Sequence, residues 1–358
     1  MRFHLIISLF TTLIFSACND SKPTYTALKL QIEEFQFPEV SIRALVAVND
    51  STVWFAGSKG VWGYTEDHGK SWVVDTLRIP GSQPEIRSIQ ITPNGNVYLV
   101  NIMKPAGVYR STNKGSTWQQ LYMDADSNAF FDAVNFWDDQ NGILLGDAQN
   151  NCFHIAITND GGNTWNKIKC NELPPTLDNE NPYAASNTNI AIQGNSAWIG
   201  TGGKDKARVF YTTDQGKNWS VSATPIIAGR QMTGIYSVDF LNKSTGIAAG
   251  GDWDSVSLAC TNVALTKDGG ATWNKLNNAQ NDGYISCARW IPDTKGQYIF
   301  TLSGRARGGE STMAIYSFET GQWTSFPNPK NYLSAQFSSK NTVWISGKDW
   351  IGRVRIEY

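Results

Sequence analysis

The 358-residue sequence has few of the residues that build metal and cofactor sites. Its three histidines, His4, His68 and His154, show no spacing typical of metal ligands. Because zinc-type sites need clustered His, Cys or carboxylate ligands, this spacing does not predict a metal centre. No Gly-x-Gly-x-x-Gly segment precedes an expected helix, so a nucleotide or flavin cofactor is not expected either.

Charge of one sign and long apolar runs are also scarce. The formal net charge is −1, which predicts no attraction to nucleic acid or to an acidic membrane surface. Beyond the first residues, no window is apolar and long enough to span a bilayer. Aromatic residues are abundant instead, with 14 tryptophans, and the apolar periodicity of helices is rare. This composition favours an all-β repeat fold, which often forms one domain over an unusual length.

The first residues are typical of a lipoprotein export signal. Arg2 gives a short basic start, residues 5–15 form a largely apolar run, and Ser16 and Ala17 directly precede Cys18. This layout predicts cleavage before Cys18 and lipidation of that cysteine. The alternative is an ordinary signal peptide in which the cysteine is incidental.

The signal sets the expected domain organisation and localisation. We expect a signal peptide at residues 1–17, an anchor linker at 18–23 and a folded domain at 24–358. The protein is then exported, on the periplasmic or cell-surface side, and contacts the membrane through its lipid anchor only.

An eight-residue motif recurs along the folded part. Five copies are nearly complete and a sixth is worn, and their tryptophans are 46, 47, 54, 54 and 50 residues apart. That spacing fits one four-stranded blade of a β-propeller per repeat. The copies occupy residues 65–72, 111–118, 158–165, 212–219, 266–273 and 317–323.

Each copy predicts a tight hairpin turn. The side-chain oxygen at its third position can accept hydrogen bonds from turn N–H groups, and the glycine at its fifth position supplies a positive φ. The final tryptophan begins the next strand and packs over the turn. The predicted structural pairs are Asp67 with Trp72, Asn113 with Trp118, Asp160 with Trp165, Asp214 with Trp219, and Asp268 with Trp273.

The strands around the motif predict a seven-bladed β-propeller. Starts of a first strand recur near residues 42, 86, 131, 187, 235, 286 and 333. The last unit, residues 332–358, has three expected strands, whereas residues 26–32 form one spare strand before the first unit. We expect this N-terminal strand to complete the last blade and close the ring, because closure removes exposed sheet edges.

The motif resembles that of the Asp-box (BNR-like) propeller superfamily, which includes sialidases. Residues 246–250, Gly-Ile-Ala-Ala-Gly, followed by residues 265–273, Leu-Thr-Lys-Asp-Gly-Gly-Ala-Thr-Trp, more closely resemble the photosystem II stability and assembly factor family. The resemblance covers essentially the whole mature chain. It implies a non-catalytic propeller that holds a membrane protein during biogenesis. Some bacterial relatives are described as oxidoreductases, but no residues here support a redox activity.

A sialidase-like glycoside hydrolase that uses the central pocket is the alternative. Such enzymes use an arginine cluster, an acid/base Asp and a Tyr activated by Glu. Residues 78–80, Arg-Ile-Pro, look like that family's arginine motif, but they follow the first repeat, whereas the family's motif precedes it. We interpret them as a loop between blades.

One face of the propeller is the predicted partner-binding surface. The loops that join second to third strands share it with the loops that join blades, and arginine and tryptophan gather there, as interfaces favour. The candidate residues are Arg43, Arg87, Asp132, Tyr236, Trp253, Arg305, Arg307 and Trp350. We expect a protein partner at the cell envelope.

Four cysteines remain besides the lipidated one. If the strands around the third motif copy pair, Cys152 and Cys170 fall opposite each other and can form a disulfide in an oxidising compartment. For Cys260 and Cys287, in successive blades, the sequence leaves pairing and free thiols open.

Overall fold

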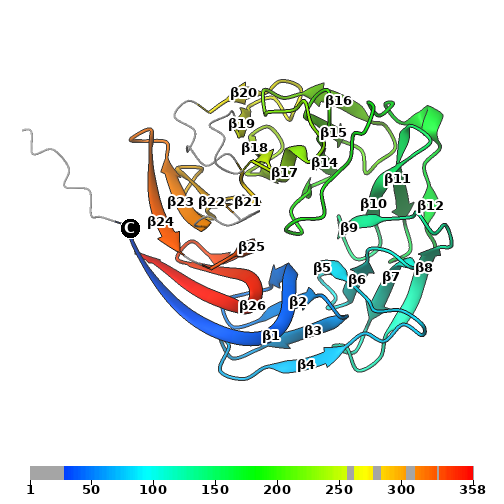
Figure 1. The fold of residues 1–358 in the computed structure, drawn as a ribbon, viewed down its shortest axis with the longest axis horizontal. Coiled ribbons are helices and arrows are strands. Elements are labelled where there is room, and N and C mark those ends of the chain that lie inside the picture. Colours follow the sequence, from blue (N-terminus) through cyan, green and yellow to red (C-terminus); the bar gives the residue numbers. More distant parts are fainter. Residues whose placement is uncertain (1–27, 256–261, 277–283, 304–310, 329, 358) are drawn as a thin grey trace, which may run out of the picture.

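The computed structural model describes residues 28–255, 262–276, 284–303, 311–328 and 330–357. They form antiparallel sheets arranged radially around a central axis, so the fold is an all-β propeller (Figure 1). The predicted signal peptide, Cys18, Cys260, Arg305 and Arg307 lie outside the described residues. Within the described part, no helix is long and apolar enough to cross a membrane.

Five of the blades are four-stranded sheets whose first strand in sequence lies innermost. One contains β5 (Ile86–Ile91), β6 (Val97–Asn101), β7 (Ala106–Ser111) and β8 (Gln119–Asp124). The next two contain β9 (Phe131–Phe136), β10 (Gly142–Gln149), β11 (Cys152–Thr158) and β12 (Asn166–Lys167), and then β13 (Ile190–Gln193), β14 (Ser196–Gly200), β15 (Arg208–Thr212) and β16 (Ser220–Ala223). The last two contain β17 (Thr233–Phe240), β18 (Gly246–Asp252), β19 (Val263–Thr266) and β20 (Asn274–Lys275), and then β21 (Cys287–Trp290), β22 (Tyr298–Ser303), β23 (Ser311–Ser317) and β24 (Gln322–Asn328).

The sixth sheet joins the two ends of the chain. It contains β25 (Tyr332–Ser339), β26 (Thr342–Glu357), β1 (Lys29–Ala47), β2 (Val53–Gly57), β3 (Val61–Thr65) and β4 (Val73–Thr76), in that order. The first half of β1 pairs with β26, from Lys29 opposite Glu357 to Gln36 opposite Trp350, and its second half pairs with β2. Figure 1 shows β1 and β26 curving side by side toward the C-terminus.

The described strands therefore form six blades, and the prediction of a seven-bladed propeller is wrong. The sequence suggested a break between a spare N-terminal strand and the first strand of the ring. Instead β1 stays extended for 19 residues, so the expected last unit and the first unit share one sheet. Aromatic packing holds the middle of β1 in place: the ring centroid of Phe37 lies 4.6 Å from that of Phe55 and 5.1 Å from that of Trp72.

The five complete motif copies form turns with one hydrogen-bond pattern. In the third copy the Thr158 hydroxyl donates to Asp160 at 2.8 Å and accepts from the Gly162 N–H at 2.8 Å. The carboxylate of Asp160 in turn accepts from the Thr164 N–H at 2.9 Å. The same bonds recur in the other four copies. In each turn, therefore, all these hydrogen bonds lie within one seven-residue stretch of the chain.

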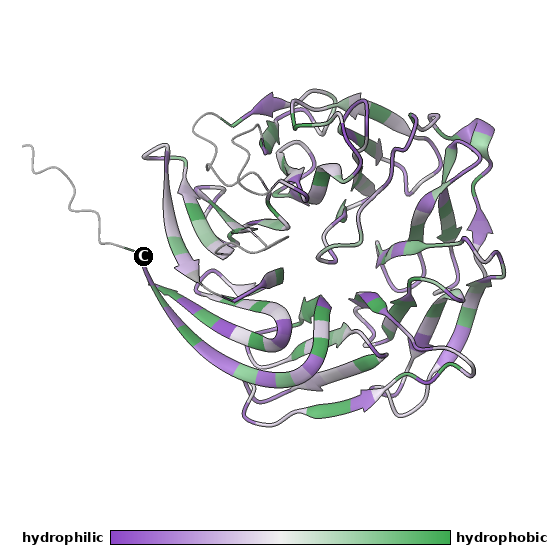
Figure 2. Cartoon of the chain, viewed as in Figure 1, coloured by the Kyte–Doolittle hydropathy of each residue, from purple (hydrophilic) through white to green (hydrophobic). Residues whose placement is uncertain are grey.

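Apolar side chains fill the space between neighbouring blades. Figure 2 shows bands of hydrophobic residues along the strands of the blades. Trp198 of β14 stacks on Phe240 of β17 at 3.6 Å between centroids, and Trp273 meets the same ring edge-on at 6.0 Å. A disulfide between Cys152 and Cys170, with Cα atoms 5.5 Å apart, ties β11 to the short 3-10 helix η1 (Cys170–Glu172).

Candidate functional site: two pockets in the central channel

A segment of the long connection between β12 and β13 fills the centre of the channel. Residues 184–189, the central segment, are hydrogen-bonded to inner strands of several blades. Ser186 donates to the carbonyl of Ser286 at 2.7 Å, and its own carbonyl accepts from Ser334 at 2.7 Å. Thr188 donates to the hydroxyl of Ser237 at 2.8 Å. The segment divides the channel into two pockets that share the same inner strands.

The first pocket, here called the arginine pocket, has a volume of about 360 Å³. It takes its polar and aromatic walls from the starts of the inner strands and from the loops beside them. Its polar and aromatic lining includes Arg43, Arg87, Asp132, Asp147, Tyr183, Tyr236, Trp253 and Tyr284.

Four of these side chains come from the same kind of local structure, a β-bulge near the start of an inner strand. In β1, Ile42 lies opposite Gly57 and Ala44 opposite Ala56, so Arg43 is the extra residue. The register skips residues in β5, β9 and β17 in the same way. The skipped residues are Arg87, Asp132 and Tyr236. Because a bulge turns a side chain out of the regular alternation, these four residues face the channel.

Glycine on the second strand makes the bulge sterically feasible. A Cβ at Gly57 would lie 2.4 Å from the Ser41 carbonyl oxygen, and one at Gly146 would lie 2.4 Å from the Phe130 carbonyl oxygen. Such contacts are too close for any side chain. At three of the four bulges, those of Arg43, Asp132 and Tyr236, a glycine lies across from the first residues of the inner strand. This glycine is a sequence signal for a channel-facing residue that the sequence analysis missed.

The two arginines place positive charge at this pocket. Arg43 donates to the Ala185 carbonyl at 3.2 Å, and Arg87 forms an ion pair with Glu85 at 3.4 Å. Burial, followed by the charge of Arg87, lowers the pKa of Arg43. Arginine stays protonated in proteins, so both guanidinium groups keep donors available for an anionic group.

Two aspartates lie beside the arginines. Asp132 is 1% exposed, and neither of its carboxyl oxygens has a hydrogen-bond partner among the described residues. Burial, together with the charge of Asp147, raises the pKa of Asp132 well above its usual range. Burial also raises the pKa of Asp147 to about 7. The net charge of the pocket is therefore sensitive to pH near neutrality.

Three tyrosines form an aromatic wall. Tyr183 stacks on Tyr236 at 4.3 Å between centroids, and Tyr284 meets Tyr236 edge-on at 4.8 Å. The hydroxyl of Tyr236 donates to the Met232 carbonyl at 2.8 Å, and burial raises its pKa. A tyrosine held in this way is a poor nucleophile, because it is neither ionised nor hydrogen-bonded to a general base.

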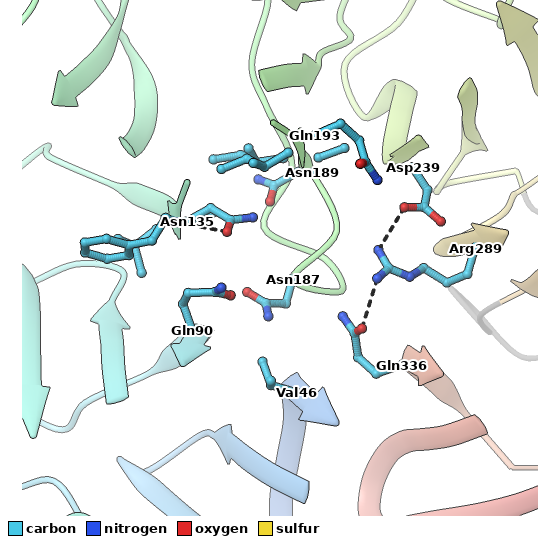
Figure 3. Close-up of a pocket in the computed structure, with 15 residues that line it drawn as sticks. Val46, Gln90, Asn135, Asn187, Asn189, Gln193, Asp239, Arg289 and Gln336 are labelled. Atoms are coloured by element: carbon cyan, nitrogen blue, oxygen red, sulfur yellow. Dashed lines mark hydrogen bonds and ion pairs between the residues drawn. The ribbon is translucent and has the colours of Figure 1, made fainter. Parts of the chain in front are cut away.

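The second pocket, the amide pocket, lies on the other side of the central segment and has a volume of about 370 Å³ (Figure 3). Inner strands supply its side chains three residues after those of the arginine pocket: Val46 follows Arg43 on β1, and Gln90 follows Arg87 on β5. Most of its polar groups are carboxamides, namely Gln90, Asn135, Asn187, Asn189, Gln193 and Gln336.

The two charged residues of the amide pocket are paired with each other. Arg289 lies 3.5 Å from Asp239 and donates to Gln336 at 3.0 Å, as Figure 3 shows. The second oxygen of Asp239 accepts from the backbone N–H of Trp290 at 2.8 Å. The pocket is thus neutral overall and rich in groups that both donate and accept hydrogen bonds.

The structure brings five of the predicted partner-binding residues together and separates a sixth. Arg43, Arg87, Asp132, Tyr236 and Trp253 all line the arginine pocket. Trp350 does not: it is 4% exposed and packs edge-on against Tyr332 at 5.7 Å. The sequence analysis missed Asp147 of β10, the residues Tyr183 and Tyr284 outside the named strands, and the entire amide pocket.

The residues that would support a hydrolase do not converge. Arg78 is 81% exposed, lies 3.8 Å from Asp75 and lines a surface cleft separate from both channel pockets. Among the described residues, the arginine pocket is lined by two arginines and by no glutamate. In the same part of the chain, no group of three or more His, Cys, Asp or Glu could hold a metal ion.

Comparison with known proteins gives matches to one family and to several propellers. A family model described as Photosynthesis system II assembly factor YCF48 matches residues 109–344. Photosystem II stability/assembly factor HCF136, chloroplastic, from Arabidopsis thaliana is 30% identical over 123 residues, which are 34% of this chain and 27% of that protein. The match therefore spans about a quarter of the curated relative's length.

Two solved structures show the likeness in fold. A structure of YCF48 bound to D1 peptide has a TM-score of 0.63 and 14% identity, and the match covers 90% of this chain and 96% of that one. Virginiamycin B lyase from Staphylococcus aureus has a TM-score of 0.65 and 11% identity, and the match covers 91% and 99% of the two chains. At these identities the similarity establishes the propeller fold alone.

Proposed function

The chain belongs to the photosynthesis system II assembly factor YCF48 family, and from this premise we propose that it is a non-catalytic scaffold that binds a protein segment at its arginine pocket. The observation that carries the proposal is the convergence of Arg43, Arg87 and an aromatic wall on one pocket. Guanidinium groups bind carboxylates through paired, charge-assisted hydrogen bonds. Tyrosine and tryptophan bury large areas in the centres of protein interfaces.

The partner is a polypeptide segment with an acidic residue. Two arginines attract its carboxylate, while Tyr183 and Trp253 offer flat surfaces to neighbouring side chains. YCF48 itself has been solved with a D1 peptide bound, which supports a peptide as the kind of ligand for a propeller of this family.

We place this scaffold at the cell envelope, held by lipid on Cys18. The sequence of the first residues supports export. The disulfide between Cys152 and Cys170 also supports it, because such bonds persist in oxidising compartments. Membrane fractionation with lipid labelling tests the anchor: Cys18→Ser should lose the label, and a labelled Cys18→Ser protein would contradict lipidation at this residue.

Peptide binding tests the proposed site. The probes are two fluorescent peptides of equal length, one with aspartate and glutamate and one with lysine at the same positions, added to the mature chain. We expect the acidic peptide to bind. Arg87→Gln should lower the affinity for this peptide roughly tenfold or more, which corresponds to about 1.4 kcal/mol or more of binding free energy.

Arg78→Gln is the matched control, because Arg78 is exposed and lies away from the channel. It should bind the acidic peptide as the parent does. Equal losses in the two variants, or equal binding of the acidic and lysine peptides, would place the binding site elsewhere.

A further inference from the structure

The amide pocket has a chemistry that peptide binding at the arginine pocket does not use. Its carboxamides come from separate inner strands, with Gln90 on β5, Asn135 on β9 and Gln336 on β25, and from the central segment. Figure 3 shows them facing a common space from several sides. Elements held by different blades therefore set the spacing of these groups.

One of these groups has no partner in the protein. Asn189 is 1% exposed, and neither its carboxamide oxygen nor its nitrogen has a hydrogen-bond partner among the described residues. Figure 3 shows the Asn189 carboxamide near that of Asn135, on the wall of the pocket. Leaving a buried polar group unsatisfied costs about 1–3 kcal/mol, so such a group calls for a bound molecule that both donates and accepts.

We infer that the amide pocket binds a neutral sugar. A hydroxyl group donates one hydrogen bond and accepts two, and a carboxamide has two N–H donors and an oxygen that accepts two, so the carboxamide positions that the protein leaves unused can serve neighbouring hydroxyls. A hexose carries several hydroxyls on a compact ring, and a volume of about 370 Å³ is within the range of small-molecule sites. A long peptide does not suit this pocket, because the central segment closes one end of it.

The balanced charges of the amide pocket favour a neutral ligand. Asp239 and Arg289 compensate each other, and both are engaged by further hydrogen bonds to Trp290 and Gln336. No excess charge remains in the lining to repay the desolvation of a carboxylate, phosphate or ammonium group. Sugar acids and amino sugars should therefore bind more weakly than neutral hexoses.

The pocket binds rather than hydrolyses. Glycoside hydrolysis generally needs two carboxyl groups placed on either side of the scissile bond. Among the described residues that line the pocket, Asp239 is the one carboxylate, and it is held by Arg289. The sugar is therefore released unchanged.

Ligand-observed NMR and calorimetry on the mature chain test this inference. The probes are D-glucose, D-galactose, D-mannose and N-acetyl-D-glucosamine, with D-glucuronate and D-glucosamine as charged counterparts. We expect saturable one-to-one binding of at least one neutral sugar, and at least fivefold weaker binding of its charged counterpart.

Variants locate the site. Gln90→Leu and Gln90→Glu should each lower the affinity for the neutral sugar at least tenfold. The glutamate variant keeps the size of the side chain, so that the fold is preserved. Gln322→Leu, at an exposed carboxamide on the outer strand β24, should bind as the parent does. The inference is overturned if no neutral sugar binds, if charged sugars bind better, or if both Gln90 variants bind like the parent.

Discussion

The side-chain carboxamide of Asn187 forms the two hydrogen bonds to β5 that a neighbouring strand would otherwise form. Removing it tests whether the central segment stabilises the fold. Its Nδ2 donates to the Ile89 carbonyl at 3.0 Å, and its Oδ1 accepts from the Ile89 N–H at 3.3 Å. Ile89 is fully buried, and Asn187 has a φ of 60°. Asparagine tolerates this left-handed conformation better than most residues do.

The expected loss of stability follows from these two features. Asn187→Ala leaves the N–H and carbonyl of Ile89 without their partners, and each such group costs about 1–3 kcal/mol unless water reaches it. Alanine in the left-handed region adds roughly 1 kcal/mol. Because Asn187 is partly accessible, we take about 1–1.5 kcal/mol for each of the two groups and expect a total loss of about 3–4 kcal/mol.

Two further variants separate the causes. Asn187→Gly removes the same hydrogen bonds, but glycine adopts the left-handed backbone conformation without strain. This variant should therefore be roughly 1 kcal/mol more stable than Asn187→Ala. Asn187→Asp keeps the shape but turns an acceptor toward the Ile89 carbonyl, and should be at least as unstable as the alanine variant at neutral pH. Urea unfolding with linear extrapolation measures all three. An alanine variant within 0.5 kcal/mol of the parent would refute the role of the carboxamide.

Four other substitutions or conditions probe the blades and the arginine pocket. Trp273→Ala should lower the stability by about 3–5 kcal/mol, because it removes a large buried ring, and a thermal melt measures it. Replacing Cys152 and Cys170 by Ser should lower it by about 3 kcal/mol, since the bridge closes a loop over a sequence separation of 18. Burial lowers the pKa of His154 to about 4 in the folded protein. As the pH falls below about 6.5, this histidine is protonated in the unfolded chain but not yet in the folded one, so the free energy of unfolding should fall by about 3 kcal/mol between pH 6.5 and pH 4. Burial raises the pKa of Asp147 to about 7, so its protonation should strengthen binding of the acidic peptide between pH 8 and pH 6.

Each of these expectations has its own contradicting outcome. A Trp273→Ala protein that melts with the parent would show that the ring does not stabilise the blade. If a reducing agent lowers the melting temperature of the double serine variant as much as that of the parent, the disulfide is not the cause of the parent's extra stability. His154→Gln should flatten the acid branch of the stability curve, and Asp147→Asn should remove the pH dependence of peptide affinity; unchanged profiles would refute those assignments.

The repeat turns could be predicted because all their determinants are local. Thr158, Asp160, Gly162 and Thr164 lie within seven residues, and the hydrogen bonds among them depend on nothing else in the chain. The pairing of cysteines around the third turn is a consequence of the same local hairpin, β11 with β12. The family resemblance rested on the same short segments.

The number of blades could not be predicted in that way. Whether residues 33–41 break or continue a strand depends on what covers Phe35 and Phe37, and those partners include Trp72 and Trp344, far away in the sequence. The central segment was missed for a similar reason. Its polar residues show no periodicity, and their partners lie on strands up to 148 residues away.

The bulges explain why one set of inner strands can carry two different pockets. In a regular strand, residues three apart point to opposite faces of the sheet. The extra residue in β1, β5 and β9 instead turns Arg43, Arg87 and Asp132 to one end of the channel. The residues three positions later, Val46, Gln90 and Asn135, reach the other end. The central segment supplies the wall between them. Charge can therefore be changed at the bulge positions without altering the neutral pocket, because the two sets of side chains share a backbone but not a cavity.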